Sequence, residues 1–275
     1  MSAIATDRRV GVIGMGHMAE ALVSGAISAG VIKPDSVICS RRGRDALTRI
    51  ADEMGVGVTR DNAEVVVSSD LVLLSVKPQQ LQDVMPRLSA HWRPGQVLVS
   101  VMAGVTLARL EAQIHTPDVA VVRVMPNSPC IIGKGVSAFC LGHHAGPDEA
   151  RLVTRLFGAV GDVVQVEESQ MDAVTALSGS GPAYVYLFLE ALAAAGEKVG
   201  LEADVASALA LATFRGAAQL AMESDASPGA LRGAVTSPGG TTEAALEVLE
   251  TSGFLDIVAD AVVAARDRGR ELGRG

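Results

Sequence analysis

The residues with the clearest chemical signature are the glycines of Gly14-Met15-Gly16-His17-Met18-Ala19, which directly follow a short apolar run. A G-x-G-x-x-A pattern between a strand and a helix is typical of sites that bind the pyrophosphate of a dinucleotide. The first glycine permits a tight turn, the second lets the backbone approach the phosphates, and the alanine keeps the helix close to the strand. The helix then presents free N–H groups to the anion. The alternative is an ordinary glycine turn in an α/β fold.

The next apolar run ends with Ile38-Cys39-Ser40-Arg41-Arg42 and carries no acidic residue at its end. Sites specific for NAD usually place Asp or Glu there to bind the ribose 2′-hydroxyl. A hydroxyl and two guanidinium groups suit a 2′-phosphate instead, through charge-assisted hydrogen bonds. The sequence therefore predicts NADPH, with NADH as a second nicotinamide cofactor. Alternatively, Arg41 and Arg42 form a solvated basic turn.

Three later apolar runs also end in polar or glycine-containing loops. Ligands of open α/β sheets lie at the carboxyl ends of the strands, so these loops are expected to face the same crevice. Asn62 begins a helix, where it either caps the helix or reaches the adenosine ribose. Arg123 precedes the last loop and is more typical of a packing or ion-pair residue than of a catalyst. The loops are Val76-Lys77-Pro78-Gln79, Val101-Met102-Ala103-Gly104 and Met125-Pro126-Asn127-Ser128-Pro129.

Two glycine-rich segments interrupt the second half of the chain. Ser178-Gly179-Ser180-Gly181-Pro182 breaks a helical pattern and restarts it with proline in the first turn, as a close-packed kink or a functional loop would. Thr236-Ser237-Pro238-Gly239-Gly240-Thr241-Thr242 leads into another helix. Backbone N–H groups and hydroxyls converge at such a helix start, which suits a substrate carboxylate. The alternative is an ordinary capped helix start.

The predicted C-terminal domain, 166–275, has no histidine that could act as a general acid or base. The last histidine is His144, and the only lysine after residue 165 is Lys198, away from both glycine-rich segments. Alcohol and hydroxyacid dehydrogenases must move a proton on or off the substrate oxygen, and they usually keep His, Lys or Tyr for it. A protonated imine is already electrophilic and needs little beyond positioning.

The apolar pattern predicts an α/β fold with an N-terminal doubly wound (Rossmann) parallel sheet domain, followed by an all-helical C-terminal domain. Strands are predicted over 10–14, 36–40, 71–76, 97–101 and 119–124, with weaker ones over 136–140 and 163–166. Their apolar runs are continuous, as in strands buried on both faces. Helices are predicted over 170–177, 182–199, 203–223, 229–234, 242–250 and 255–272. We therefore predict a nucleotide-binding domain over 1–165 and a substrate-binding and dimerisation domain over 166–275.

Composition narrows the class of protein. The 275 residues are 49% hydrophobic and 20% charged, which favours a sizeable core and an apolar surface covered by a partner subunit. A net charge of −8 argues against nucleic acid as the main partner. The N-terminus is unlike a signal peptide, and the apolar stretch 183–195 is too short to span a membrane. The three cysteines lack metal-ligand spacing, so we expect a metal-free cytoplasmic protein.

These residues together resemble the pyrroline-5-carboxylate reductase family, over essentially the whole chain. The most specific stretches are 177–184 and 235–246, and Val76-Lys77-Pro78-Gln79 and Met125-Pro126-Asn127 agree as well. The resemblance implies reduction of 1-pyrroline-5-carboxylate to L-proline, the last step of proline biosynthesis. It also implies a homodimer, often assembled into a decamer.

The resemblance further implies which residues form the sites. The loop from Ser237 to Thr242, including Gly240 and the N–H of Thr241, would hold the substrate carboxylate. The Thr242 hydroxyl would lie near the ring nitrogen, and Glu168 near the substrate. Cofactor contacts are implied at Ile13, Gly14, Met15, Gly16, His17, Met18, Ser40, Arg41, Arg42, Asn62, Val76, Lys77, Pro78 and Ala103.

Two other hypotheses make different demands on the sequence. A reductase of the β-hydroxyacid dehydrogenase type would need a lysine on the helix between the domains, and neither 170–177 nor 182–197 contains one. A non-catalytic NADP-binding sensor would keep the first glycine motif but would not need the 236–242 loop.

Overall fold

The computed structural model describes residues 8–274, and the chain divides into two compact units. One unit extends to Ser180 and includes the end of the chain from Ala265, and the other is Gly181–Ala264. The first unit contains every strand of the described residues, whereas the second contains only helices.

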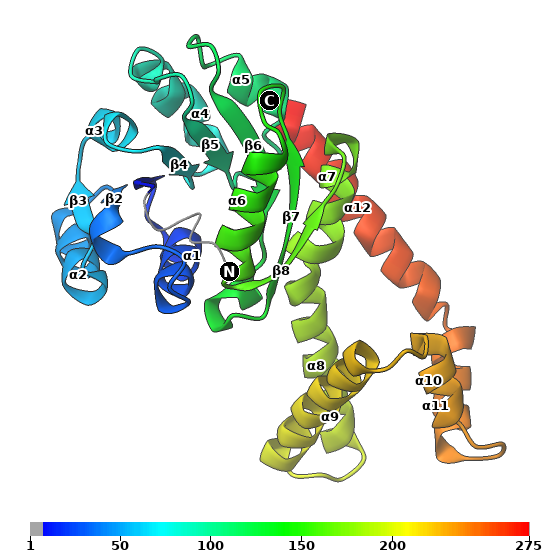
Figure 1. Ribbon diagram of the computed structural model, residues 1–275. Coiled ribbons are helices and arrows are strands. Elements are labelled where there is room, and N and C mark those ends of the chain that lie inside the picture. The colour runs from blue at the N-terminus through cyan, green and yellow to red at the C-terminus, as the bar shows by residue number, and fades with distance from the viewer. Residues whose placement is uncertain (1–7, 275) are drawn as a thin grey trace. The chain divides into compact units, whose positions relative to one another are not determined.

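The first unit is built on one eight-stranded sheet in the order β3-β2-β1-β4-β5-β6-β7-β8 (Figure 1). Every strand pair is parallel except β6 and β7. The order of the first six strands is that of a Rossmann dinucleotide-binding fold. The strands are β1 (Val10–Ile13), β2 (Val37–Ser40), β3 (Gly57–Thr59), β4 (Leu71–Leu74), β5 (Val97–Ser100), β6 (Ala120–Met125), β7 (Gly135–Leu141) and β8 (Gly161–Gln165).

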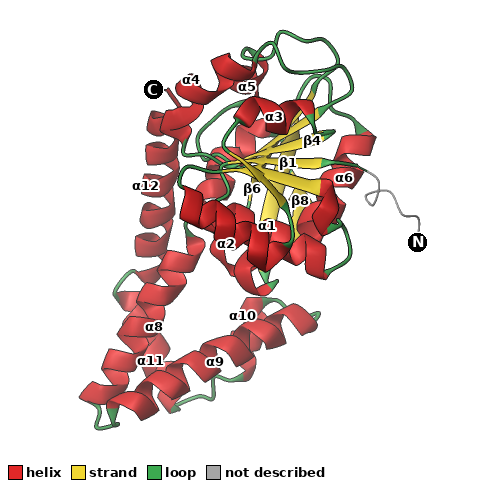
Figure 2. Ribbon diagram, turned by 90° about the vertical axis from the view of Figure 1, so that its left-hand side faces the viewer, coloured by secondary structure: helices red, strands yellow, loops and turns green. Residues whose placement is uncertain are grey.

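Helices cover both faces of this sheet (Figure 2). Val12 and Leu73 pack into one core with residues of α1, α2 and α6, while Val72 and Leu74 pack into a second core with residues of α3, α4 and α5. Neighbouring residues of a strand thus point into different cores, which explains why the apolar runs are continuous. The helices are α1 (His17–Ser28), α2 (Arg44–Met54), α3 (Asn62–Val67), α4 (Leu81–Val84), α5 (Leu107–Glu111), α6 (Pro147–Gly158) and α7 (Met171–Val174).

Short helical turns fill several connections of this unit. The 3₁₀ turns are η1 (Pro34–Ser36), η2 (Pro78–Gln80), η3 (Met85–Leu88), η4 (Ser128–Ile132) and η5 (Glu168–Gln170), and η6 (Thr175–Gly179) is a π-helical turn. The doubly wound fold that we predicted is confirmed, with two differences of detail. β7 is antiparallel to β6, because η4 is too short for the crossover that a parallel pair requires. β3 was missed, because its three residues lie at the sheet edge and are largely exposed.

The second unit contains only helices, as predicted for the C-terminal part. Ala206 and Ala210 of α9 are its buried apolar residues, and Phe188 of α8 lies 5.8 Å from Phe214 and 6.2 Å from Phe254, between ring centroids. Many larger apolar side chains stay exposed, such as Met222, with an exposed fraction of 78%. The helices are α8 (Gly181–Lys198), α9 (Ala203–Glu223), α10 (Pro228–Ala234), α11 (Thr241–Thr251) and α12 (Phe254–Arg274), of which α12 ends in the first unit.

Gly161 provides a test of the sheet. It begins β8 with φ = +150°, and a Cβ atom there would overlap the carbonyl group of Gly135 on β7. We expect Gly161→Ala to lower the free energy of unfolding by about 3 kcal/mol, because backbone must move to relieve the overlap. Urea denaturation followed by circular dichroism measures this change.

The matched control is Gly158, the last residue of α6. A Cβ atom there has no heavy atom within 4 Å. Gly158→Ala should therefore raise the free energy of unfolding by up to about 1 kcal/mol, since alanine favours helix. Equal effects of the two substitutions would contradict the packing described for β7 and β8.

Candidate cofactor and substrate sites

The glycine loop after β1 has the backbone geometry that its sequence predicts. Gly14 has φ = +90°, and a Cβ atom there would meet the Ser75 carbonyl at 2.8 Å. The N–H groups of Gly14 and Met15 donate to the Ser40 carbonyl at 3.1 and 3.0 Å, which fixes the loop against the end of β2. Gly16 precedes α1 without a side-chain cap, and a Cβ on it would have no heavy atom within 4 Å. The first turn of α1 therefore offers N–H groups to open space, as a pyrophosphate requires.

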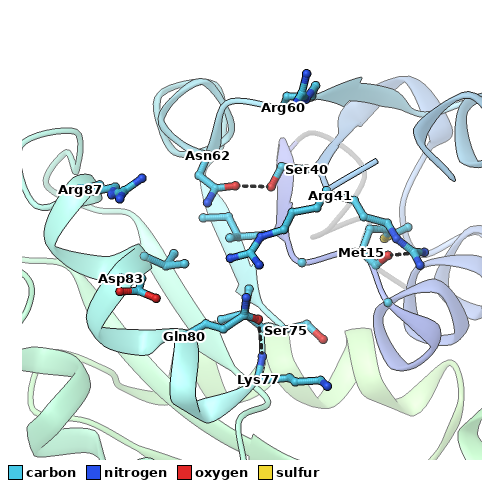
Figure 3. A pocket seen from close by; sticks show the side chains of 16 residues that line it. Met15, Ser40, Arg41, Arg60, Asn62, Ser75, Lys77, Gln80, Asp83 and Arg87 are labelled. Carbon is cyan, nitrogen blue, oxygen red and sulfur yellow. Dashed lines mark hydrogen bonds between the residues drawn. The ribbon is translucent and has the colours of Figure 1, made fainter. Parts of the chain in front are cut away.

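A pocket of about 730 Å³ opens at this loop, along the carboxyl ends of β1, β2 and β4 (Figure 3). It contains Arg41, Arg42, Arg60, Lys77 and Arg87 but a single acidic residue, Asp83. Such an excess of positive charge suits a ligand with several phosphates. The lining residues are Ile13, Gly14, Met15, Gly16, Ser40, Arg41, Arg42, Arg60, Asn62, Ser75, Val76, Lys77, Gln80, Asp83, Val84 and Arg87.

The pocket brings together most of the residues that the sequence suggested for the cofactor, but not all. His17 lines a second cavity beside α1, and the Met18 sulfur lies 3.5 Å from the Cys130 sulfur. Pro78 begins η2, and Ala103 is exposed in the turn after β5. The pocket also contains six residues that no sequence motif indicated: Arg60, Ser75, Gln80, Asp83, Val84 and Arg87. For Arg60 the missing signal was β3 itself, since the residue directly follows that short strand.

Ser40 and Asn62 form a polar pair inside this pocket. The buried Ser40 hydroxyl donates to Asn62 Oδ1 at 2.6 Å, which orients the amide. The cap of α3 is Asp61, whose Oδ1 accepts from the Ala63 N–H at 2.9 Å, so the capping alternative for Asn62 was wrong. No described residue accepts from the side-chain amide of Asn62, whose N–H groups are therefore available to a ribose hydroxyl.

The two arginines after β2 differ in their partners. Arg41 Nη1 donates to the Met15 carbonyl at 3.0 Å and to Glu20 Oε1 at 2.8 Å. Glu20 also accepts from Arg49 at 2.9 Å. Arg42 has no carboxylate within 4.0 Å in the described part of the chain. Burial, and secondarily the charge of Glu20, raises the pKa of the neighbouring Cys39 thiol to about 11, so this thiol is protonated at neutral pH.

The serine and threonine loop of the second unit is also a defined turn. Gly239 has φ = +71°, and its N–H donates to the Glu243 carboxylate at 2.7 Å. The Gly240 N–H donates to the Ser237 carbonyl at 2.9 Å, and Gly240 precedes α11 without a side-chain cap. Thr241 and Thr242 are the first residues of α11. The turn thus groups Ser237, Gly240, Thr241 and Thr242 at one helix start.

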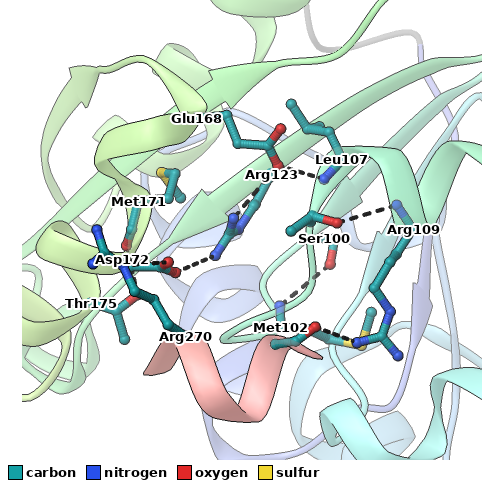
Figure 4. A network of polar contacts seen from close by, with 12 residues as sticks. Ser100, Met102, Leu107, Arg109, Arg123, Glu168, Met171, Asp172, Thr175 and Arg270 are labelled. Atoms are coloured by element: carbon teal, nitrogen blue, oxygen red, sulfur yellow. Dashed lines mark hydrogen bonds and ion pairs between the residues drawn. The ribbon is translucent and has the colours of Figure 1, made fainter. Parts of the chain in front are cut away.

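Glu168 lies in a network centred on Arg123 of β6 (Figure 4). The Arg123 side chain is 3% exposed, and its guanidinium lies 3.6 Å from both Glu168 and Asp172. Glu168 Oε1 also accepts from the Leu107 N–H at 2.6 Å, and Asp172 lies 3.7 Å from Arg270 of α12. Arg123 is therefore an ion-pair residue, as its position in the strand indicated.

The Arg123 network affects one thiol. Burial, and secondarily the charge of Glu168, raises the pKa of the Cys140 thiol to about 12, although the charge of Arg123 opposes this shift. Cys140 is paired with Arg123 across β6 and β7. A thiol held protonated in this way is a packing residue and not a nucleophile.

The first glycine-rich segment, 178–182, forms a kink, which is one of the two alternatives that the sequence left open. It contains the π-helical turn η6, after which α8 begins at Gly181. The Asn127 side chain donates to the Ser178 carbonyl at 3.1 Å and accepts from the Val136 N–H at 2.9 Å. Asn127 therefore links the loop after β6 to the kink.

Fold and site together define a dinucleotide-dependent oxidoreductase with a helical second unit. Residues 9–104 match a family model described as NADP oxidoreductase, coenzyme F420-dependent. Residues 168–272 match the model for pyrroline-5-carboxylate reductase dimerisation, which implies a homodimer.

Whole-chain comparisons identify the family. A pyrroline-5-carboxylate reductase of Glycine max is 41% identical over 96% of this chain and 95% of its own length, and one of Methanosarcina acetivorans is 38% identical over 98% and 99%. The solved structure of the Coxiella burnetii enzyme superimposes with a TM-score of 0.90 at 36% identity, covering 96% of this chain and 98% of that one. The chain belongs to the pyrroline-5-carboxylate reductase family, which confirms the resemblance seen in the sequence.

A dimerisation domain accounts for the exposed apolar surface of the second unit. Leu211 and Met222 of α9 have exposed fractions of 60% and 78%, and Leu255 of α12 has 69%. By length and composition alone α9 is apolar enough to cross a membrane, and 11% of that stretch is buried. α9 lies within the matched dimerisation region, and apolar side chains exposed in a single chain are typical of such a region.

The Arg123 network gives a stability prediction. We expect Arg123→Met to lower the free energy of unfolding by about 2 kcal/mol, because Glu168 and Asp172 lose their buried partner but remain partly solvated. The control is Arg151→Gln, which removes the exposed Arg151–Asp148 pair of α6 and should change stability by less than about 0.5 kcal/mol. Chemical denaturation measures the free energy of unfolding of both variants. Equal losses of stability would show that the buried ion pairs of Arg123 matter no more than the exposed pair of Arg151.

Proposed function

We propose that this protein reduces 1-pyrroline-5-carboxylate to L-proline with NADPH, the last step of proline biosynthesis, and that NADH is a weaker substitute. The observation that carries this proposal is the identity of about 40% over nearly the whole chain with reductases of that name. A solved relative from Plasmodium falciparum, described with NADP bound, has a TM-score of 0.87 and is 30% identical over 97% of this chain and 98% of its own. The basic pocket in the first unit is consistent with such a ligand.

The cofactor would be held mainly by backbone and cations. The Gly14–Gly16 backbone and the first turn of α1 would bind the pyrophosphate. Ser40, Asn62 and Arg42 would bind the adenosine ribose and its phosphate, and Arg41, paired with Glu20, would support the glycine loop of the same site. Val76, Lys77, Pro78 and Ala103 follow β4 and β5, so they would contact the nicotinamide half. When bound, the reduced nicotinamide supplies a hydride for the imine carbon.

The substrate demands an anion site and a hydrogen-bonding group for the ring nitrogen. The Gly240 N–H is engaged by the Ser237 carbonyl, but the first turn of α11 has no side-chain cap, so its N–H groups, including that of Thr241, suit the carboxylate together with the Ser237 hydroxyl. The half-buried Thr242 hydroxyl would accept a hydrogen bond from the iminium N–H and so orient the ring. The nitrogen keeps that proton in the product amine, so the residue positions the ring without transferring a proton. We place Glu168 near the substrate through the family resemblance alone.

We further propose the organisation of the protein. Residues 1–165 form the nucleotide-binding domain, and 166–275 form the substrate-binding and dimerisation domain. The dimers would assemble further, as a decamer, in the cytoplasm. The exposed apolar side chains of the second unit support an extensive subunit interface.

The proposed reaction is tested with purified protein, 1-pyrroline-5-carboxylate and either reduced cofactor, by the loss of nicotinamide absorbance. We expect turnover with NADPH, weaker turnover with NADH, and proline as the product. Turnover favouring NADH would keep the reaction but remove the phosphate role of the arginines. Binding of NADPH without turnover would favour a sibling reductase or a sensor.

The role of Thr242 is tested by removing its hydroxyl. Thr242→Ala should lower kcat by roughly 10- to 100-fold, the range for one positioned hydrogen bond at the reacting group. Thr242→Ser should retain most of the activity, because it keeps the hydroxyl. Thr251→Ala, at the other end of α11, is the control and should leave kcat unchanged. An unchanged kcat in Thr242→Ala would exclude this role.

A further inference from the structure

Arg60 occupies a place in the cofactor pocket that no sequence motif indicates. It directly follows β3, which pairs with β2 in parallel so that Thr59 lies opposite Ser40. The residues after these two strands, Arg60 and Arg41, therefore leave the sheet at the same edge. This is the edge at which a Rossmann fold binds the adenosine ribose. Arg60 lines the pocket there, two residues before Asn62 (Figure 3).

The charge of Arg41 is already compensated at this edge. Its guanidinium forms an ion pair with Glu20 at 2.8 Å and also donates to the Met15 carbonyl. Glu20 is shared with Arg49, which pairs in turn with Glu53 at 2.6 Å. The two cations and two carboxylates balance. Arg41 thus holds the backbone of the glycine loop against α1.

The guanidinium groups of Arg42 and Arg60, by contrast, are not neutralised by an acidic side chain of the described residues, so they are available to an anionic ligand. Both are exposed and line the pocket, and neither has a carboxylate within 4.0 Å among residues 8–274. Arg87 is also unpaired there, but it comes from η3 and not from the end of a strand beside Ser40. Two unpaired guanidinium groups therefore come from the strand ends that flank the Ser40–Asn62 pair.

Chemistry then separates the two nicotinamide dinucleotides. A phosphate on the ribose 2′-oxygen carries nearly two negative charges, which the fork of an arginine binds through two hydrogen bonds. NADH has only a hydroxyl at that position, for which Asn62 and Ser40 are sufficient partners. A second guanidinium at this point contributes to binding only when the phosphate is present.

We propose that Arg60 is a specificity-determining residue, which binds the 2′-phosphate of NADPH together with Arg42, whereas Arg41 is a positioning residue for the glycine loop. This inference rests on the proposed use of a nicotinamide dinucleotide. From the sequence alone, Arg41 would be expected to bind the 2′-phosphate together with its neighbour Arg42. The proposal assigns this contact to Arg60 instead.

The test is calorimetric titration of the full-length protein with adenosine 2′,5′-bisphosphate and with adenosine 5′-monophosphate. We expect Arg60→Gln to weaken binding of the bisphosphate about tenfold, at the low end for an exposed charge-assisted contact, and to leave monophosphate binding within about twofold. Arg41→Gln should weaken both ligands by a similar factor. In turnover, Arg60→Gln should lower the ratio of kcat/KM for NADPH to that for NADH by about tenfold.

Arg44→Gln is the matched control. Arg44 begins α2 near the same edge, is exposed, and does not line the pocket. Its substitution should leave the affinities for both nucleotides unchanged. Arg60→Lys keeps the charge without the fork, so its affinity for the bisphosphate should lie between those of the wild type and Arg60→Gln.

Two outcomes would overturn the proposal. The first is that Arg60→Gln and Arg60→Lys both prefer the bisphosphate over the monophosphate as strongly as the wild type does. The second is that only Arg41→Gln loses this preference. Because the titrations need no imine substrate, they decide the role of Arg60 even if the protein fails to reduce 1-pyrroline-5-carboxylate. Failure of turnover with intact nucleotide selectivity would instead count against the proposed function.

Discussion

The buried guanidinium of Arg123 imposes the constraint around which the end of the sheet is organised. A charge with a 3% exposed side chain must be paired, and its partners Glu168 and Asp172 come from the segment after β8. That segment therefore folds back over the end of β6. Glu168 also accepts from the Leu107 N–H at the start of α5, and Asp172 also pairs with Arg270 of α12. The two carboxylates that neutralise Arg123 therefore also hold α5 and the end of α12 in place.

A second contact within the first unit holds the glycine-rich kink. Asn127 follows β6 and bonds to the Ser178 carbonyl, within the turn where the helix widens to π geometry. A π-helical turn is uncommon and often marks a functional position. Here it directly follows α7, the helix that carries Asp172. The loop after β6 and the kink are thus one hydrogen-bonded structure, although 51 positions separate Asn127 from Ser178.

The parts of the fold that were predictable from sequence are those in which burial or backbone geometry leaves a local pattern. Continuous apolar runs predicted the buried strands, and Gly14 and Gly16 predicted the pyrophosphate loop. β3 could not be found in this way, because an exposed edge strand of three residues has no apolar pattern. Nor could Asp61 be distinguished from Asn62 as the cap, since both residue types serve in that position. The site residues and the domain boundary near residue 165 stay predictions.

Arg41 and Arg42 show why residue type alone does not assign a role. They are adjacent and chemically identical, yet one is paired with Glu20 and the other has no acidic partner in the described structure. The ion-pair partners of each arginine decide whether it holds the glycine loop in place or is free to bind a phosphate. Those partners depend on the register of the strands and the placement of the helices. The same reasoning applies to the whole molecule, whose net charge is −8 although five basic residues line the pocket beside the glycine loop. The net charge disfavours nucleic acid, but the local field at the pocket is what a phosphorylated cofactor meets.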